Sequence, residues 1–123
     1  MEVYKVANKV PDVVGYLRGV GESSMYRVSY RIGHKTFAVN KTMGLFCFKT
    51  LKDAQNFRVS SECIFKAEGH GLPYQPKYVC RFSHNLLQFY KCKRSKKSIK
   101  ELSSPAPWGT VCFPAITIGE LVE

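Results

Sequence analysis

The sequence lacks the residue spacings on which most metal and catalytic sites depend. It contains no C-x-x-C pair, and none of its three histidines stands at zinc-ligand spacing from a cysteine. Its nine acidic residues never cluster, so local spacing gives no paired carboxylates for metal binding or acid–base chemistry. Glycine-rich phosphate loops, G-x-S-x-G elbows and H-E-x-x-H segments are absent as well. The sequence therefore predicts no catalytic residue, no metal site and no cofactor.

Long apolar runs are also missing. No run approaches the roughly 20 residues that a helix needs to span a bilayer. The first ten residues carry one glutamate and two lysines and lack the apolar centre of a secretory signal. We therefore expect no membrane association and an intracellular location, in the host cytoplasm or, in a eukaryotic host, the nucleus.

The cysteines do not form a regular framework. They are five in number and widely spaced, and most lie inside apolar runs. An odd, irregular set is poorly suited to paired disulfides, whereas free cysteine is among the most buried residue types. We therefore expect buried, reduced thiols and a reducing compartment. The residues are Cys47, Cys63, Cys80, Cys92 and Cys112.

Positive charge is what the chain has in excess. It holds 19 basic and 9 acidic side chains among its 123 residues, for a formal net charge of +10. Such an excess creates a positive potential that attracts nucleic acid, nucleotides and other anions. The alternative is a basic protein without an anionic partner. Hydrophobic residues make up 45% of the chain, which is typical of a folded protein, and the length predicts a single domain over 1–123.

Alternating and short apolar runs predict strands along most of the chain. In 25–32 every second side chain is apolar, which is the period of a half-buried strand. The apolar run 45–48 fits a strand buried on both faces. The spacing in 85–92 fits a strand about as well as a helix, and we favour a strand. Further strands are predicted at 3–6, 63–67 and 78–82, with a turn-rich stretch at 69–73. One last strand, interrupted at Pro114, is predicted over 110–113 and 116–118.

One helix is predicted directly after the apolar run 45–48. The Thr50 side chain can accept a hydrogen bond from a backbone amide of the first turn, and Asp53 favours the positive end of a helix. Leu51, Ala54 and Phe57 follow at helical spacing, which predicts a helix over 51–57 with this stripe packed on the sheet.

The predicted elements point to one fold class. A second, shorter helical turn is expected at 98–102, before the proline-rich stretch that follows. Five or six strands and one or two short helices, without strict alternation, are typical of an α+β fold with a mainly antiparallel sheet.

The first candidate site is the polar face of the 25–32 strand. Arg27 and Arg31 lie on one face of that strand, and Tyr30 lies on the other. Arg81, in the predicted strand 78–82, could converge on the same patch. Guanidinium groups bind phosphate bidentately and aromatic rings stack on bases, so these four residues are the predicted ligand-binding residues. The alternative is an ordinary solvent face with cross-strand ion pairs.

The second candidate is a basic run at 91–100. Six cations in ten residues could neutralise several phosphates, and each contact would add salt dependence. The run is also similar to a nuclear localisation tract. The alternative is a solvated loop. Its cations, the predicted nucleic-acid contacts, are Lys91, Lys93, Arg94, Lys96, Lys97 and Lys100.

Two segments resemble those of short phage and bacterial proteins. Residues 44–57 resemble a G-[LK]-x-x-F-x-T-L-x-x-A-x-x-F block in which a strand is followed at once by a helix. Residues 104–111 and the tail to 122 resemble the P-x-G-T-V strand that closes the same proteins. The chain departs from them in its many cysteines and its lysine-rich run. The general size is similar to that of phage proteins that sequester nucleotide immune signals, of the Thoeris anti-defence type. This resemblance implies a phage counter-defence protein and assigns no binding residue.

Three functions follow from these observations. The first is a non-enzymatic binding protein that captures a small anionic, nucleotide-like ligand. The second is a nucleic-acid-binding domain that uses the basic run, and the third is a small nucleotide-dependent transferase. An enzyme is therefore the less favoured class, and assembly into a homo-oligomer stays open.

Overall fold

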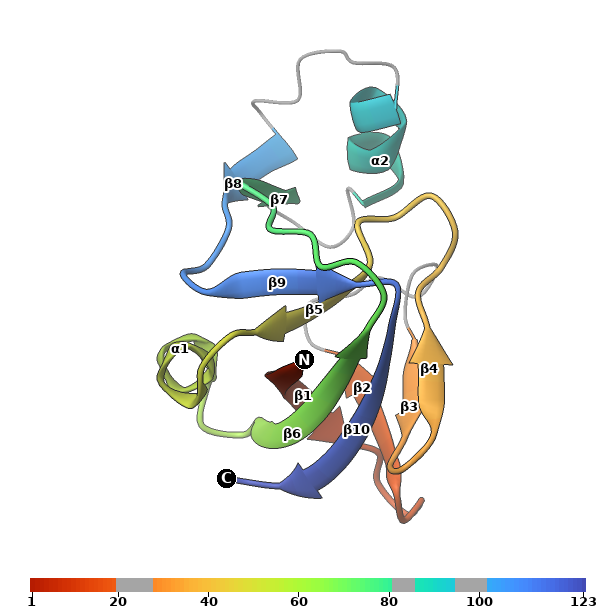
Figure 1. Cartoon of the computed structure of the whole chain (residues 1–123), viewed down its shortest axis with the longest axis vertical. Helices are drawn as coiled ribbons and strands as arrows, with labels where there is room; N and C mark the ends of the chain where they lie inside the picture. Colours follow the sequence, from red (N-terminus) through yellow and green to blue (C-terminus); the bar gives the residue numbers. More distant parts are fainter. Residues whose placement is uncertain (20–27, 81–85, 95–101) are drawn as a thin grey trace.

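The structure of the chain, a computed structural model, describes residues 1–19, 28–80, 86–94 and 102–123 (Figure 1). Strands dominate it, and two short helices accompany them. The elements are β1 (Glu2–Lys9), β2 (Tyr16–Gly19), β3 (Ser29–Arg31), β4 (Lys35–Phe37), β5 (Leu45–Phe48), α1 (Leu51–Phe57), β6 (Cys63–His70), β7 (Tyr78–Cys80), α2 (Leu86–Arg94), β8 (Ser103–Pro105), β9 (Thr110–Phe113) and β10 (Ala115–Leu121).

The main sheet has eight strands, and all of its pairings are antiparallel. Six of them follow the order β3-β2-β1-β6-β10-β4, while β5 pairs with β1 and β9. A short turn joins β3 to β4, so the two ends of this order lie side by side and the sheet curls into a barrel (Figure 1). Within that turn, the Ile32 amide donates to the Gly15 carbonyl at 2.9 Å and the Gly33 amide donates to the Ile118 carbonyl at 2.8 Å. The turn is thereby tied to both sides of the barrel.

Every second side chain along the strands points into the barrel, and these side chains fill its interior. Val3, Ala7 and Leu17 point inward, and the larger Phe65 and Phe113 fill the space between them. Burial of each of the larger side chains, Val3, Leu17, Phe65 and Phe113, stabilises the fold by about 1.5–3 kcal/mol. The interior cluster consists of Val3, Ala7, Leu17, Tyr30, Leu45, Cys47, Phe65, Ala67, Val111, Phe113, Ile116 and Ile118.

Helix α1 covers the outer face of β1 and β6, and the sequence predicted both of its ends. The Thr50 hydroxyl accepts from the Asp53 amide at 3.1 Å and caps the first turn. Ala54 is fully buried against the sheet, in a cluster with Val6 and Ile64. Phe57 is 39% exposed, so the predicted stripe packs on the sheet only in part.

The predicted fold class is confirmed in outline: an α+β fold with a mainly antiparallel sheet and two short helices. The described part of the chain holds more strands than the five or six expected. The last predicted strand is divided at Pro114 into β9 and β10. The additional strands are β2, β4 and β8, each only three or four residues long. Runs this short carry too little alternation to be distinguished from loops.

Two local predictions were wrong. Residues 86–94 form helix α2, not a strand, because Leu86, Phe89 and Tyr90 recur at helical spacing and the two aromatic residues are buried. The predicted turn at 69–73 begins later, since β6 continues through His70. Gly69 fits this strand because a Cβ there would lie 2.5 Å from the Phe113 ring.

Some predictions fall outside the described residues. The strand expected at 25–32 is described only from residue 28, and β3 begins at Ser29. Ile32, expected inside, is 40% exposed because β3 ends at Arg31 and the chain turns. Part of the strand at 78–82 and most of the helical turn at 98–102 also lie in undescribed segments.

Candidate functional site

The outward side chains of three neighbouring strands form one surface. Leu17 of β2 points into the barrel, so Tyr16 and Arg18 on either side of it point outward. Tyr16 pairs with Arg31 of β3 across the sheet. In β4, Thr36 pairs with the buried Ile116, which directs its two neighbours outward. We name this surface the cation–aromatic face; its members are Tyr16, Arg18, Arg31, Lys35 and Phe37.

Two cations of this face lie against aromatic rings. The Arg31 guanidinium carbon is 5.8 Å from the centre of the Tyr16 ring, and the Lys35 Nζ is 5.3 Å from the centre of the Phe37 ring. Such contacts orient a cation without removing its charge. The Tyr16 side chain is 37% exposed and that of Phe37 is 66% exposed. The face therefore offers both positive charge and ring surface to solvent.

Carboxylates are placed elsewhere in the fold. Strands β2, β3 and β4 contain no aspartate or glutamate. In the described segments, Arg18, Arg31 and Lys35 have no carboxylate partner. The ion pairs of the described residues involve other elements: the Met1 amino group pairs with Glu68 of β6, Lys66 of β6 with Glu120 of β10 at 3.4 Å, and Arg58, after α1, with Glu123 at 3.8 Å. The positive potential of the cation–aromatic face is thus not neutralised locally.

The four ligand-binding residues that were predicted from the strand pattern do not all lie on this face. Arg31 lies on the face as an exposed cation. Tyr30 is completely buried inside the barrel, with the Lys5 Nζ 5.0 Å from its ring centre, so its ring is not open to a stacking base. Arg27 and Arg81 lie outside the described residues. Of the four, only Arg31 is placed on an accessible surface here.

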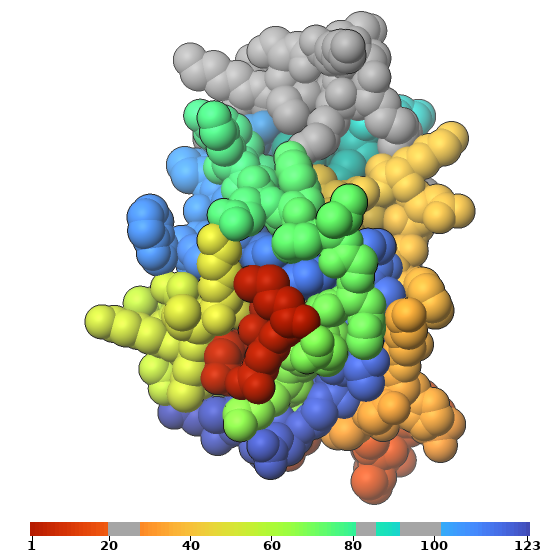
Figure 2. Space-filling model, viewed as in Figure 1, coloured from red at the N-terminus to blue at the C-terminus, as the bar shows by residue number. Residues whose placement is uncertain are grey.

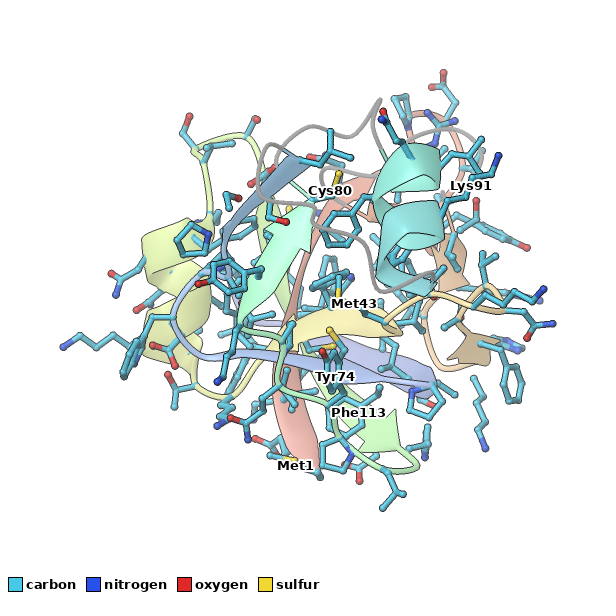
Figure 3. All side chains as sticks on the ribbon, turned by 90° about the horizontal axis from the view of Figure 1, so that it is seen from above. Met1, Met43, Tyr74, Cys80, Lys91 and Phe113 are labelled. Carbon is cyan, nitrogen blue, oxygen red and sulfur yellow. The ribbon has the colours of Figure 1, made fainter. Side chains whose placement is uncertain are left out.

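The basic run begins on α2. Lys91 is exposed, and Figure 3 shows it on the side of α2 away from Cys80 of β7. Lys93 and Arg94 belong to the last turn of α2. The remaining predicted cations, Lys96, Lys97 and Lys100, lie outside the described residues.

Sequence reasoning missed most of the face. Tyr16, Arg18 and Phe37 belong to two strands too short to be recognised from the alternation of their residues. Only the register across β2 and β3 brings Tyr16 next to Arg31. A hairpin signal around Gly33, whose φ of 83° suits a tight turn, could have pointed to β4.

A buried lysine and a buried cysteine lie inside the barrel. The Lys5 side chain is 3% exposed, and its Nζ donates to the Phe46 carbonyl at 2.8 Å. Burial raises the pKa of the Cys47 thiol to about 11, and the positive charge of Lys5 lowers it in part. The thiol is therefore protonated at neutral pH and is a poor nucleophile.

None of the cysteines with described side chains forms a disulfide. Cys47 and Cys112 are buried, as expected, while Cys63 and Cys80 are only half-buried. Within the described residues, no three histidine, cysteine or acidic side chains lie together in a way that could hold a metal ion. None of the described helices is long and apolar enough to cross a membrane.

Comparisons with known proteins add no relative. No protein-family model, curated protein or solved structure matches the chain.

Proposed function

We propose that this protein binds single-stranded nucleic acid on the cation–aromatic face and performs no chemistry on it. The observation that carries this proposal is the pairing of exposed cations with exposed rings on strands without any carboxylate. Cations on such a surface hold phosphates, and the rings stack on unpaired bases. In double-stranded nucleic acid the bases stack on one another, so they are not accessible for stacking on these rings.

The open shape of the face favours a polymer over a single nucleotide. Its side chains project from the outside of a barrel, so the phosphates of one nucleotide would stay largely in water and gain little from each cation. A strand gains many such contacts at once and releases counterions with each. The net charge of +10 adds a long-range attraction for the same polymer.

A small nucleotide is the alternative ligand, because it offers the same two groups, a base and a phosphate. The Tyr16–Arg31 pair combines one ring with one guanidinium, which is enough to hold one base and one phosphate. This alternative includes the capture of nucleotide immune signals by a phage protein. The two sources differ in how strongly salt weakens binding.

The test measures binding of a fluorescently labelled oligothymidine by anisotropy. The double variant Arg31→Ala/Lys35→Ala removes both cations that lie against rings, and we expect its affinity to fall at least tenfold. The matched control is Arg58→Ala/Lys66→Ala, which also removes one arginine and one lysine, but from ion pairs with Glu123 and Glu120.

The control variant should bind close to the wild type. Equal losses in both variants would mean that overall charge alone attracts the oligonucleotide and would overturn the cation–aromatic face as the site. Binding of labelled mononucleotide with the same affinity as the oligomer would favour nucleotide capture.

A further inference from the structure

The most exposed aromatic side chain of the described residues lies far from the cation–aromatic face. Trp108, the single tryptophan of the chain, is 88% exposed in the turn between β8 and β9. In Figure 2 the blue atoms of this turn project at the left edge, whereas the orange atoms of β3 and β4 form the right edge. An indole placed fully in water has a hydration cost that a purely structural side chain would avoid.

The turn that carries Trp108 is held firmly by its neighbours. The Thr110 hydroxyl donates to the Pro107 carbonyl at 2.6 Å, and the Thr110 amide donates to the same oxygen at 3.1 Å. Gly109 has a φ of 80°, and a Cβ there would lie 2.1 Å from Asp53 Oδ2. The Asp53 side chain of α1 therefore packs directly on the turn. This packing and the two Thr110 hydrogen bonds hold the backbone of the turn in place.

Lysines approach the turn from both sides. The Lys49 amide donates to the Gly109 carbonyl at 2.9 Å, and the Ala106 amide donates to the Lys77 carbonyl at 2.9 Å. Both lysine side chains are exposed. Their backbones are hydrogen-bonded to residues within two positions of Trp108, which anchors both lysines beside the turn.

We infer that Trp108 is a second stacking site for an unpaired base, with Lys49 and Lys77 contacting the adjacent phosphates. This inference rests on the proposed function, because the ligand is the same single strand. A protein partner fits less well, since lysine is depleted in the centres of protein interfaces, while phosphates match its charge. Because the two sites lie on opposite flanks, one strand must pass around the molecule to occupy both (Figures 1 and 2).

The experiment uses the fluorescence of Trp108, which is the only tryptophan signal of the wild-type chain. Oligothymidine of about 20 nucleotides, carrying a fluorescent label for anisotropy, is added while tryptophan emission is followed in parallel. We expect emission to be quenched along the same binding curve that anisotropy reports. Trp108→Ala should weaken binding about fivefold or more, whereas Trp108→Phe should keep most of the affinity.

Two further variants separate stacking from a distant effect. Lys49→Ala/Lys77→Ala should weaken binding and reduce the quenching at a given oligonucleotide concentration. The charge-matched double variant Lys66→Ala/Lys9→Ala should leave the quenching intact, because neither lysine flanks the turn. Full binding by anisotropy with unchanged tryptophan emission would overturn this site while leaving the cation–aromatic face in place. No anisotropy change at any concentration would overturn the proposed function itself.

Discussion

Cys47 and Lys5 share the barrel interior, and their chemistry is set by that burial. The Cys47 thiol is completely buried, and its pKa rises from 9.0 to about 11 because the thiolate would lose its hydration. The Lys5 ammonium lowers the same pKa by attraction, but desolvation is the larger effect. A thiol in this state acts as a small apolar side chain, so it belongs to the core and not to a reactive site.

This shift predicts a loss of stability at alkaline pH. Between pH 9 and 11 the unfolded thiol ionises while the folded thiol keeps its proton, so the unfolded chain binds fewer protons and the free energy of unfolding falls as pH rises. The stabilisation that comes from the protonated thiol is fully present below pH 9, and about 2–3 kcal/mol of it is lost by pH 11. Urea denaturation across this range measures it.

The Cys47→Ala variant provides the control for that measurement. The two proteins differ in no other titratable group, so the difference between their pH profiles reports the Cys47 thiol and its interaction with Lys5. We expect the variant to lose less stability than the wild type above pH 9. Parallel profiles would mean that the Cys47 thiol ionises normally in the folded protein.

At the scale of elements, local signals and long-range pairing differ in what they reveal. Helix α1 was predicted at both ends because its cap, its first-turn acid and its apolar spacing all lie within a few residues. Helix α2 was missed because Phe89 and Tyr90 fit either period, and only packing decides between them. Strands β2 and β4 were missed because pairing with β1, β3 and β10 creates them.

The candidate site shows the same limit. Arg31 could be singled out from the alternation around it, and its exposure agrees with that pattern. Tyr30 could not be judged in the same way, because alternation shows that it lies on the other face without showing that this face is the barrel interior. The Tyr16–Arg31 contact depends on register between two strands, which the spacing of residues along one strand does not contain.

The packing of α1 yields a prediction about its last aromatic residue. The Phe57 ring lies 5.0 Å from the ring of Phe48, centre to centre, but 39% of the residue is exposed. Replacement of Phe57 by Ala should therefore cost about 1–2 kcal/mol of unfolding free energy, since only part of the ring leaves an apolar environment. Phe65→Ala, which leaves a cavity in the barrel interior, should cost about 3–5 kcal/mol of unfolding free energy. Equal costs on urea denaturation would show that α1 packs more deeply than described.

At the scale of the whole molecule, the carboxylates that form ion pairs are separated from the cations of the face. Glu68, Glu120 and Glu123 pair with Met1, Lys66 and Arg58, while β2, β3 and β4 carry cations without carboxylates. This separation gives the molecule a direction of approach for an anionic polymer. The flanking position of Trp108 then adds contacts that only a strand longer than one nucleotide could use.

The dependence of oligonucleotide affinity on salt concentration tests the central claim most directly. Each phosphate contact on a single strand contributes a slope of about −0.7 to the plot of log affinity against log salt. We expect a steep slope for the wild type, a slope shallower by about 1.4 for Arg31→Ala/Lys35→Ala, and an unchanged slope for Arg58→Ala/Lys66→Ala. An Arg31→Ala/Lys35→Ala slope equal to that of the wild type would contradict phosphate binding on the cation–aromatic face.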